Sequence, residues 1–587
     1  MKNLIIILAA ALVIALPFIF RRPADSGLWK AGDPELVVVS PHNEAIRQSF
    51  SDGFTKWHNK NYGVPVRIDW RVVGGTTEIM RYLASEYSAS LRQQFIRAGH
   101  VWPADGASTA LASKPPADSD KSSLWHYFRS IDDPSKITCG IDVFFGGGVY
   151  DHNKAARQGL SVPAWDDQLV PPGIFEDRNG SVLIPIKVNG ETWRSKSFYG
   201  AALSTFGICF NFDRLKDLGI SKIPSTWEDL ADPLYFGELG LTDPTKSGSV
   251  AKAFEMIIHT ACARSVTDAG YDRNQISIYE SLIVEAACAP GEIPPGVPAA
   301  YQQAVEQGWV DGLQLVRKLG AQTRYFTANA GKVPVDVSLG FVAAGICIDF
   351  YGRYQSEMSL SRDNQPVMSY ITPVGGSSVT ADPISLLRGA KKRVLGQHFI
   401  EFVLCEDGQK LWNYRKGSPG GPRRFSLRRL PIRRDFYPSD DSALQRSFLK
   451  HKPYLSDPLW QPDVDAYQLS QAFLYEGRWT ARHFGIQRDL IKAMCLDSGD
   501  ELRAAWRAIL ENGGPDANPE AMSAFEALPG EPFPLNWSSA ITTCTSTPRI
   551  DLLREWTAFF RKQYRSAREL AELRQDSLLN RNITQQK

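Results

Sequence analysis

Residues 35–70 read ELVVVSPHNEAIRQSFSDGFTKWHNKNYGVPVRIDW, and this stretch decides the fold class. Its β-branched run at 36–39 ends at a Ser-Pro pair and predicts a buried strand. The apolar residues that follow recur at spacings of four, four and three, which is one helical face: Ile46, Phe50, Phe54 and Trp57. A second strand is predicted at 64–70. Strand, helix and strand within about thirty-five residues form a βαβ unit, whose strands we expect to be parallel.

The same mixture of short apolar strands and amphipathic helices continues downstream. A strand predicted at 141–145 breaks into Gly146-Gly147-Gly148, and later apolar runs repeat the pattern at 199–210, 339–350 and 394–412. From about residue 439 strand signals thin out and helical periodicity dominates, as in one row of apolar residues: Leu553, Trp556, Phe560, Tyr564 and Leu570. The sequence therefore predicts an α/β protein that ends in a mostly helical appendage.

The composition limits the classes of protein to which the chain can belong. The chain has 587 residues, 66 Lys+Arg and 64 Asp+Glu, for a net charge of +2, and 43% of its residues are hydrophobic. These values are those of a globular protein with large cores and exclude a mainly disordered chain. A near-neutral balance also lacks the basic footprint of a nucleic-acid binder, so no nucleic-acid partner is expected.

The N-terminus has the pattern of a signal anchor or a signal peptide, and a buried core helix is only a minor alternative. Residues 3–20 contain no charge, and they are flanked by Lys2 and by Arg21-Arg22. At about 1.5 Å per residue, this stretch covers roughly 27 Å, close to the hydrocarbon thickness of a bilayer. We expect an uncleaved signal anchor within residues 1–22, with a cleaved signal peptide as the alternative. In both cases the bulk of the chain leaves the cytoplasm, so the expected location is periplasmic or extracellular.

The eight cysteines are scattered, and no CxxC pair occurs among them. Cys209, Cys347 and Cys405 lie inside apolar runs and are predicted to be small core residues. The others can pair in an oxidising compartment, but the pairing cannot be derived from the sequence. A structural zinc site is not expected without paired spacing.

Common catalytic signatures are absent, namely GxxxxGK[ST], HExxH, GxSxG and GxGxxG, which favours binding over turnover. Four loops rich in Gly, Ser, Thr or Asp instead follow predicted strands and open predicted helices: residues 40–44, 74–78, 146–148 and 243–249. Ligands of α/β proteins sit at this edge of the sheet, where helix N-termini point into a crevice. The alternative is that these are ordinary turn and N-cap residues.

Six segments in this order resemble the extracellular solute-binding proteins of ABC importers, especially the branch that includes ferric-iron binders. They are VVVSPHNEAIRQSFSDGFTKW at 37–57, IDVFFGGG at 141–148, GICFNFDRL at 207–215, STWEDLADPLYFGELGLTDPTKSGS at 225–249, GICIDFYGRY at 345–354 and FIEFVLCEDGQKLW at 399–412. The resemblance implies two α/β lobes joined by crossing strands, with solute held in the cleft between them. It extends over residues 35–437, and leaves 438–575 as the helical appendage and 576–587 as a disordered tail.

The resemblance also implies a function and a site. The chain would capture a small solute and deliver it to a membrane permease whose ATPase is a separate subunit, and it would not be an enzyme itself. The expected ligand-binding residues are loop groups of the cleft: His42, Asn43, Gly75, Thr76, Gly147, Thr245, Ser247, Tyr351 and Asp382. The alternatives are an exported ligand sensor that reports to a membrane partner, and an exported enzyme that uses the same cleft.

Iron-binding relatives coordinate Fe(III) through phenolates, often of two adjacent tyrosines, together with a histidine and an acidic group; a hard cation prefers such oxygen ligands. The matching segment here is Asp349-Phe350-Tyr351-Gly352-Arg353-Tyr354, in which Phe350 replaces one tyrosine. The possible Fe(III) ligands are Tyr351, Tyr354, His42 and Asp349. An organic solute such as a sugar or polyamine stays open, with Trp70, Trp193 and Tyr199 as aromatic candidates.

Two further features each have a structural and a functional interpretation. His152 follows the glycine run and is expected to be a loop residue rather than a ligand. The arginines between 423 and 434 are expected to form a solvated or salt-bridged face, with docking of an anionic partner as the alternative.

Overall fold

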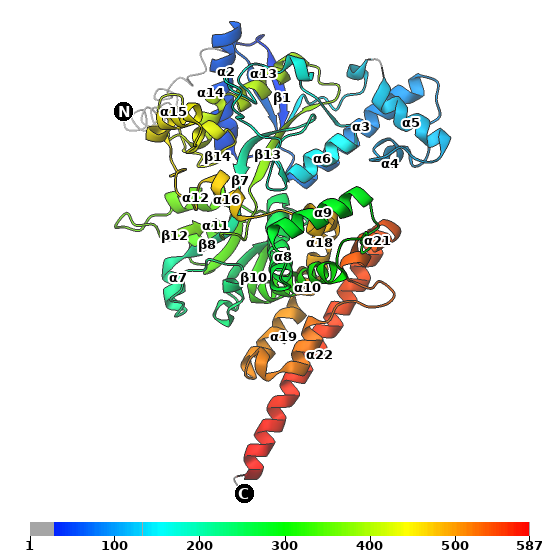
Figure 1. Cartoon of the computed structure of the whole chain (residues 1–587), viewed down its shortest axis with the longest axis vertical. Coiled ribbons are helices and arrows are strands. Elements are labelled where there is room, and N and C mark those ends of the chain that lie inside the picture. Colours follow the sequence, from blue (N-terminus) through cyan, green and yellow to red (C-terminus); the bar gives the residue numbers. More distant parts are fainter. Residues whose placement is uncertain (1–28, 132, 586–587) are drawn as a thin grey trace, which may run out of the picture.

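The computed structural model describes residues 29–131 and 133–585, so the predicted anchor at 3–20 lies outside the described residues. Two sheets form two lobes, one above the other in Figure 1. Among the helices of the described residues, none has the length and apolar character needed to cross a bilayer.

The sheet of lobe 1 has the strand order β14-β7-β13-β3-β1-β2, with β4 paired to β13. Its strands are β1 (Glu35–Val39), β2 (Arg67–Arg71), β3 (Val143–Phe145), β4 (Ser161–Val162), β7 (Tyr199–Ser204), β13 (Thr380–Leu387) and β14 (Leu430–Pro431). The main helices of this lobe are α2 (Glu44–Tyr62), α3 (Thr76–Arg97), α6 (Val149–Arg157), α13 (Arg393–Leu404) and α14 (Glu406–Asn413).

The predicted βαβ unit is present at the start of lobe 1. Strands β1 and β2 are parallel, with Val37 opposite Asp69, and α2 connects them. Ile46, Phe50 and Phe54 of α2 are buried at their four-residue spacing. The helix begins at an N-cap whose side chain, Asn43 Oδ1, accepts from the Ile46 N–H at 3.1 Å. Local sequence pattern therefore predicted this unit correctly.

The sheet of lobe 2 has the order β10-β9-β11-β8-β12. Its strands are β8 (Phe206–Asn211), β9 (Leu239–Thr242), β10 (Thr323–Thr327), β11 (Ala344–Ile348) and β12 (Met368–Ile371). Its helices are α7 (Phe212–Asp217), α8 (Gly248–Asp268), α9 (Arg273–Ala286), α10 (Ala299–Gln322), α11 (Lys332–Ser338) and α12 (Asp349–Met358). Cys209 and Cys347 are fully buried in β8 and β11, and all seven cysteines of the described side chains are free thiols.

Two crossings join the lobes directly. The chain leaves lobe 1 on β7, passes through Thr205 and enters lobe 2 on β8; it returns from β12 to β13. The crossings hold each other, because Thr205 Oγ1 lies 2.9 Å from Thr372 Oγ1 and the Phe206 N–H donates to Ser377 Oγ at 2.9 Å. This is the two-lobed architecture expected from the sequence, in which a short hinge permits the lobes to close over a ligand.

The C-terminal helices start on lobe 1 and then cross to lobe 2, which is a third passage. They are α15 (Ser442–His451), α16 (Ala466–Ala472), α17 (Gly477–Thr480), α18 (Phe484–Ile491), α19 (Gly499–Glu511), α20 (Pro519–Glu526), α21 (Trp537–Ser546) and α22 (Arg549–Gln585). Figure 1 shows α22 passing α19 and extending beyond lobe 2. Because α22 runs to Gln585, it includes most of the stretch expected to be a disordered tail.

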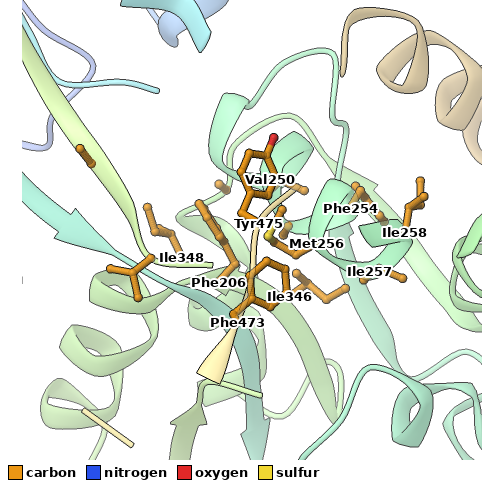
Figure 2. Close-up of a cluster of buried hydrophobic side chains, with 14 of the residues drawn as sticks. Phe206, Val250, Phe254, Met256, Ile257, Ile258, Ile346, Ile348, Phe473 and Tyr475 are labelled. Atoms are coloured by element: carbon orange, nitrogen blue, oxygen red, sulfur yellow. The ribbon is translucent and has the colours of Figure 1, made fainter. Parts of the chain in front are cut away.

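This helical region packs against the core of lobe 2 and is not a separate unit attached to its surface. Helix α10 is buried around most of its circumference. A helix with apolar residues on most of its faces must be covered by other elements on those faces. Arg317 of α10 is fully buried, and its Nη2 donates to the Ala527 carbonyl oxygen at 3.0 Å. Figure 2 shows Phe473 and Tyr475 lying among side chains of α8, β8 and β11. The region from 438 onward therefore shares the core of lobe 2.

Candidate functional site

A cavity of about 780 Å³ lies between the two lobes. Its volume falls in the range of ordinary small-molecule sites. Lobe 1 contributes His42, Gly75, Thr76, Gly147, Asp151, Ser204, Asp382 and Arg429; lobe 2 contributes Phe206, Ser247, Lys252, Phe350 and Tyr351; and the C-terminal region contributes Tyr475, Ala481 and Phe484. The cleft is thus built from three parts of the chain.

A buried charged cluster forms the floor on the side of lobe 1. His42 follows β1, Asp382 lies on β13, and Arg429 directly precedes β14. His42 Nε2 lies 3.0 Å from Asp382 Oδ2, and Arg429 Nη1 donates to the same oxygen. Arg429 Nη2 also donates to Ser204 Oγ at 2.6 Å. Four strands of the sheet, β1, β7, β13 and β14, are thereby tied together where they meet the cleft.

Opposing effects set the ionisation of this cluster. Burial by itself raises the pKa of Asp382, but Arg429 and His42 outweigh it, and the net pKa lies well below the usual value. Burial lowers the pKa of His42 despite the attraction of Asp382. The cluster is therefore a carboxylate–guanidinium pair with a neutral imidazole beside it. Three atoms remain without a partner among the described residues: His42 Nδ1, Asp382 Oδ1 and Arg429 Nε.

Three helices begin at the cavity. Helices α3 and α6 have Gly75 and Gly148 at their N-caps and therefore no side-chain cap, while α8 begins after Ser247. The first N–H groups of a helix have no partner within it, and the helix dipole makes that end positive. Thr76 lies at the start of α3 and is 7% exposed. Its hydroxyl group forms no hydrogen bond with any described residue. Donors from both lobes thus converge on one space.

Asp151, in the first turn of α6, also lines the cavity. Burial raises its pKa to about 6, although Arg488 and Lys154 act in the opposite direction. Part of the population is therefore protonated in mildly acidic solution, and a protonated carboxyl group can donate a hydrogen bond to an acceptor in the cleft.

The lobes touch in this structure. A Cβ atom added at Gly75 of lobe 1 would lie 3.0 Å from the Lys246 carbonyl oxygen of lobe 2. A Cβ at Gly248 would lie 3.5 Å from Asp151 Oδ2 and 4.0 Å from Thr76 Oγ1. The N-terminus of α8 therefore faces those of α3 and α6 at close range, which is a closed arrangement of the cleft.

A second polar network lies deeper, where lobe 2 meets the C-terminal region. Lys252 Nζ lies 2.9 Å from Glu191 Oε1 and 3.0 Å from Glu255 Oε2. Burial opposes the charge on Lys252, but the two carboxylates raise its pKa well above the usual value. Tyr475 Oη donates to Glu255 Oε1 at 2.5 Å. These side chains satisfy one another, so this network is a wall of the cleft.

Seven of the nine predicted ligand-binding residues line the cavity: His42, Gly75, Thr76, Gly147, Ser247, Tyr351 and Asp382. Two of the predicted residues do not. Asn43 caps α2, and Thr245 Oγ1 donates to Asp243 Oδ1 at 2.6 Å while its carbonyl oxygen accepts from Arg488. Both are loop residues at strand ends, as predicted, but their polar groups are used within the protein.

The four possible Fe(III) ligands are not brought together. His42 and Tyr351 line the cavity, whereas Tyr354 and Asp349 do not. Asp349 is fully buried and its Oδ1 accepts from the Phe350 N–H at 2.8 Å, because it sits in the first turn of α12. No group of three or more His, Cys, Asp or Glu suited to a metal occurs in the part of the chain that the structure describes.

One expectation on a single residue was wrong, and another held only in part. His152 is no loop residue: it lies buried in α6, where its Nδ1 lies 2.6 Å from Ser385 Oγ. The arginines between 423 and 434 were expected to form a solvated or salt-bridged face: Arg428, Arg429 and Arg433 do form salt bridges, with Asp457, Asp382 and Asp435, but Arg429 and Arg433 are buried and not solvated. The interleaved Leu427, Leu430 and Ile432, all buried, were the signal for this in the sequence.

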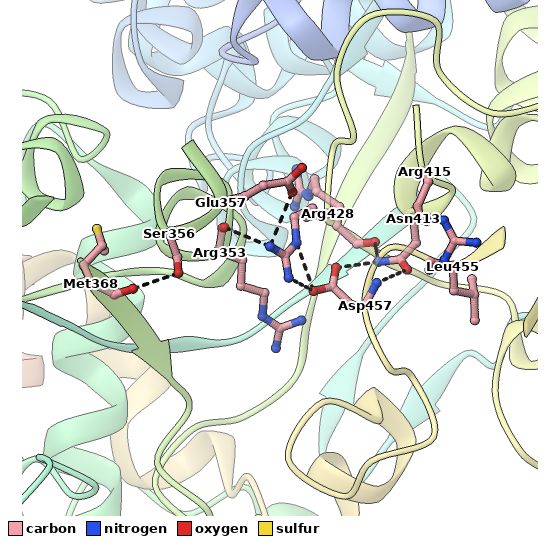
Figure 3. A network of polar contacts seen from close by, with 10 residues as sticks. Arg353, Ser356, Glu357, Met368, Asn413, Arg415, Arg428, Leu455 and Asp457 are labelled. Atoms are coloured by element: carbon pink, nitrogen blue, oxygen red, sulfur yellow. Dashed lines mark hydrogen bonds and ion pairs between the residues drawn. The ribbon is translucent and has the colours of Figure 1, made fainter. Parts of the chain in front are cut away.

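Figure 3 shows the role of another arginine in this run. Arg428 Nη2 donates to Asp457 Oδ1 at 2.7 Å, and its Nη1 donates to the Arg353 carbonyl oxygen at 3.3 Å. Asp457 Oδ2 in turn accepts from Asn413 Nδ2 at 3.0 Å. Arg428 thus ties the third passage of the chain to α12 of lobe 2.

The aromatic residues of the cleft also differ from those expected. Trp193 and Tyr199 are buried in lobe 1, and Trp70 donates to Ser51 Oγ at 2.8 Å; none of them lines the cavity. The rings that do line it are those of Tyr150, Phe206, Phe350, Tyr351, Tyr475 and Phe484. The guanidinium of Arg429 lies 4.3 Å from the centre of the Phe350 ring, a cation–π contact across the lobes.

The comparison with known proteins agrees with the family resemblance predicted from the sequence. Residues 164–275 match the family model described as bacterial extracellular solute-binding protein. The resemblance to this family is confirmed over these residues. The matched part includes the first crossing, through β7 and β8, and the start of α8 at the cleft. An uncharacterised protein of Haemophilus influenzae is 23% identical over 270 residues, which are 46% of this chain and 60% of that protein's length.

Solved structures with a similar arrangement are distant. The periplasmic binding protein AfuA from Actinobacillus pleuropneumoniae, solved with exogenous fructose-6-phosphate bound, is 15% identical with a TM-score of 0.43, over 75% of this chain and 95% of that one. A substrate-binding protein of an ABC transporter from Agrobacterium tumefaciens is 14% identical with a TM-score of 0.42, over 80% and 96%. Apo ferric ion-binding protein A from Pasteurella haemolytica is 11% identical with a TM-score of 0.38, over 78% and 97%.

Proposed function

We propose that this chain is an exported solute-binding protein that holds a small organic solute with an anionic group, a phosphate or a carboxylate, in its interlobe cleft. It releases the solute to a membrane permease, and a separate subunit hydrolyses ATP. The family match over 164–275, the two lobes joined by crossings and the cavity of about 780 Å³ support this proposal. The apolar residues 3–20 would tether the protein to the inner membrane on its periplasmic side.

One observation supports an anionic group in the solute. Helices α3 and α6 of lobe 1 and α8 of lobe 2 all begin at the cavity. Free N–H groups and aligned dipoles at helix N-termini are an established way to hold phosphate or carboxylate. Thr76 adds, at the same place, a hydroxyl group that bonds to none of the described residues. Because the donors belong to opposite lobes, an anion between them gains most when the cleft is closed, which is the differential affinity that closure requires.

The remaining groups suit the organic part of the solute. Arg429, Asp382 and His42 line the cleft and bring both donors and acceptors to it, and the buried atoms Arg429 Nε, Asp382 Oδ1 and His42 Nδ1 have no partner among the described residues. The rings of Tyr351 and Phe484 provide apolar surface for a carbon skeleton. The cleft thus combines an anion-binding end with a mixed polar and aromatic end.

Fe(III) is the poorer occupant. The guanidinium of Arg429 lies against His42, with Nη1 3.3 Å from His42 Nε2, and a trivalent cation bound beside a buried guanidinium is electrostatically unfavourable. Phe350, which replaces a tyrosine, packs on that guanidinium and offers no oxygen.

A thermal-shift series tests the proposal. Residues 29–587 would be heated with inorganic phosphate, sugar phosphates, dicarboxylates, neutral sugars, spermidine or ferric citrate. A ligand at about 100 times its Kd adds about 2.7 kcal/mol to the free energy of unfolding, which raises the Tm of a chain of this length by about 2 °C. We expect such shifts from phosphate- or carboxylate-bearing solutes. Shifts confined to spermidine, neutral sugars or iron would contradict the proposal.

A matched pair of variants localises the anion. Thr76→Val removes the unpaired hydroxyl group and should reduce the affinity for the stabilising anion by about tenfold, the usual value of a hydrogen bond to a charged group. Thr267→Val makes the same substitution at an exposed position of α8, where the hydroxyl bonds only to the Ala263 carbonyl oxygen, and should leave the affinity unchanged.

A further inference from the structure

One wall of the cleft comes from the C-terminal helical region and not from the helices and strands of the two sheets. Tyr475, Ala481 and Phe484 line the cavity beside residues of both lobes, and all three come from the helical region after residue 438. Phe484 is the first residue of α18, and it is buried although it stands at a cavity. This region therefore takes part in the site.

On one side this wall is fastened to lobe 2. Glu255 of α8 accepts hydrogen bonds from Tyr475 Oη at 2.5 Å and from Thr480 Oγ1 at 2.8 Å. The Trp479 indole N–H donates to Glu280 Oε1 at 2.9 Å, and Glu280 of α9 also pairs with Arg478 at 2.6 Å. These contacts are buried and charge-assisted, and Figure 2 shows Tyr475 seated against α8. The start of α18 must therefore move with lobe 2.

On its other side α18 reaches lobe 1 across the cleft. Arg488 Nη2 donates to Thr77 Oγ1 of α3 at 2.8 Å. The same side chain donates to lobe 2, with Nε to the Pro244 carbonyl oxygen at 2.7 Å and Nη2 to the Thr245 carbonyl oxygen at 3.1 Å. The ring of Phe484 lies 4.7 Å from that of Tyr150 in α6. One guanidinium and one aromatic pair thus bridge the lobes.

We propose that α18 is an interlobe clasp: it completes the solute site with Phe484 and holds the closed cleft through Arg488. The proposal rests on the proposed function for the identity of the site, but the clasp itself is a property of the empty protein. Opening moves α3 and α6 away from α8, so it must break the Arg488–Thr77 bond and separate Phe484 from Tyr150. The side chain at position 484 also limits how far a solute can extend toward α18.

The clasp predicts a change in opening that needs no ligand. Thr77→Val removes the acceptor on lobe 1 and leaves both bonds from Arg488 to lobe 2 in place. Loss of one charge-assisted hydrogen bond should favour the open state by about tenfold. Arg488→Ala removes the bridge from the other end and should have at least the same effect. Arg482→Ala is the matched control, because Arg482 is exposed on the same segment and forms no hydrogen bond or ion pair with any described residue of either lobe.

Hydrogen–deuterium exchange of the ligand-free chain 29–587 measures this opening. Peptides covering 76–87, 149–157 and 484–491 should exchange about tenfold faster in Thr77→Val and Arg488→Ala than in wild type and Arg482→Ala. Peptides from the centre of α10 should not change, which shows that the fold is intact. Wild-type exchange in both variants, or equal acceleration in the control, overturns the clasp.

A second readout separates the clasp from the proposed function. Inorganic phosphate is titrated into wild type, Thr77→Val and Arg482→Ala, and its dissociation constant is compared. With the clasp, Thr77→Val binds phosphate more weakly, by a factor that rises to about tenfold where the open state already predominates, because the dissociation constant varies as the reciprocal of the closed population. If no protein binds any anion while the exchange difference persists, the proposed function fails and the clasp stands. If wild type and Thr77→Val bind phosphate equally and exchange equally, the clasp fails and the proposed function stands.

Discussion

Arg429 shows how one side chain can serve both the fold and the site. It is fully buried, bonds to Asp382 and Ser204 on two strands of lobe 1, and stacks on Phe350 of lobe 2. Transfer of a guanidinium from water into such a place is unfavourable unless a carboxylate compensates it. Its contribution therefore depends on the pair, and removal of one member leaves the other as a buried, unpaired charge.

The first prediction concerns that pair. Arg429→Met should lower the free energy of unfolding by roughly 3–5 kcal/mol, because Asp382 remains charged in a buried position. Arg424→Met, at an exposed position of the same run, should stay within about 0.5 kcal/mol of wild type. Urea denaturation measures both. Adding Asp382→Asn to Arg429→Met should recover part of the loss; equal stability of Arg429→Met and Arg424→Met would refute the buried pair.

The second prediction concerns pH. The pKa of Asp151 is raised to about 6 in the folded protein, so the folded state takes up a proton where the unfolded carboxyl is already ionised. The free energy of unfolding should therefore fall, through this group, as the pH rises from about 4 to about 6. Asp151→Asn cannot ionise and should be more stable than wild type at pH 7, by roughly 1–3 kcal/mol.

The measurement is a set of denaturation curves between pH 4 and pH 8. The advantage of Asp151→Asn should disappear near pH 4, where the wild-type carboxyl is protonated in the folded protein. Asp268→Asn, at an exposed position of α8, serves as the control and should follow the wild type throughout. A pH-independent difference would mean that burial of the charge is not its cause.

At the scale of elements, the local patterns were reliable and the long-range pairings were not predictable. The βαβ unit over 35–70 and the helix-opening loops follow from periodicity and turn chemistry, and seven of the nine predicted site residues line the cleft. The bond between His42 and Asp382 joins positions 340 residues apart, and nothing in the local sequence marks Arg429 as the third member. Such side chains are assembled by the sheet order, which a single sequence does not state.

The third prediction tests the approach of α3 to α6. Gly147 has φ of +111°, and a Cβ atom there would lie 2.7 Å from Thr76 Cγ2 at the N-terminus of α3. Gly147→Ala should therefore lower both the Tm and the affinity for phosphate. Gly219→Ala is the matched control: its φ is +72°, but a Cβ atom there meets nothing within 4 Å. It measures backbone strain alone, and an equal loss of affinity in both variants would refute the packing argument.

At the scale of the whole molecule, the C-terminal region is an integral part of lobe 2 and not an accessory to it. The sequence indicated a helical segment but not its location, because an amphipathic helix states which face is buried and not what covers it. In the structure, lobe 2 and the C-terminal helices cover each other's apolar faces. Arg317 of α10 is enclosed by the region from Met494 to Ala527, and Phe560 of α22 lies 5.4 Å from the Arg317 guanidinium.

The fourth prediction follows from this packing. A chain that ends at residue 438 should be insoluble or lack a cooperative thermal transition, because the apolar surfaces of α8 and α10 would lie open to water. A chain that ends at residue 575 keeps the packed part of α22 and should melt like the full chain. Circular dichroism melts compare the two. A soluble, cooperative chain ending at 438 would show that the lobes are complete without the helical region.

The occupant of the cleft is the central claim, and native mass spectrometry combined with elemental analysis tests it most directly. The protein, residues 29–587, would be purified rapidly without dialysis, and the mass of any bound molecule would be determined before and after denaturation. We predict one organic anion per chain, bearing phosphate or carboxylate, with iron far below one equivalent. Stoichiometric iron without an organic anion, or a bound polyamine, would contradict the account.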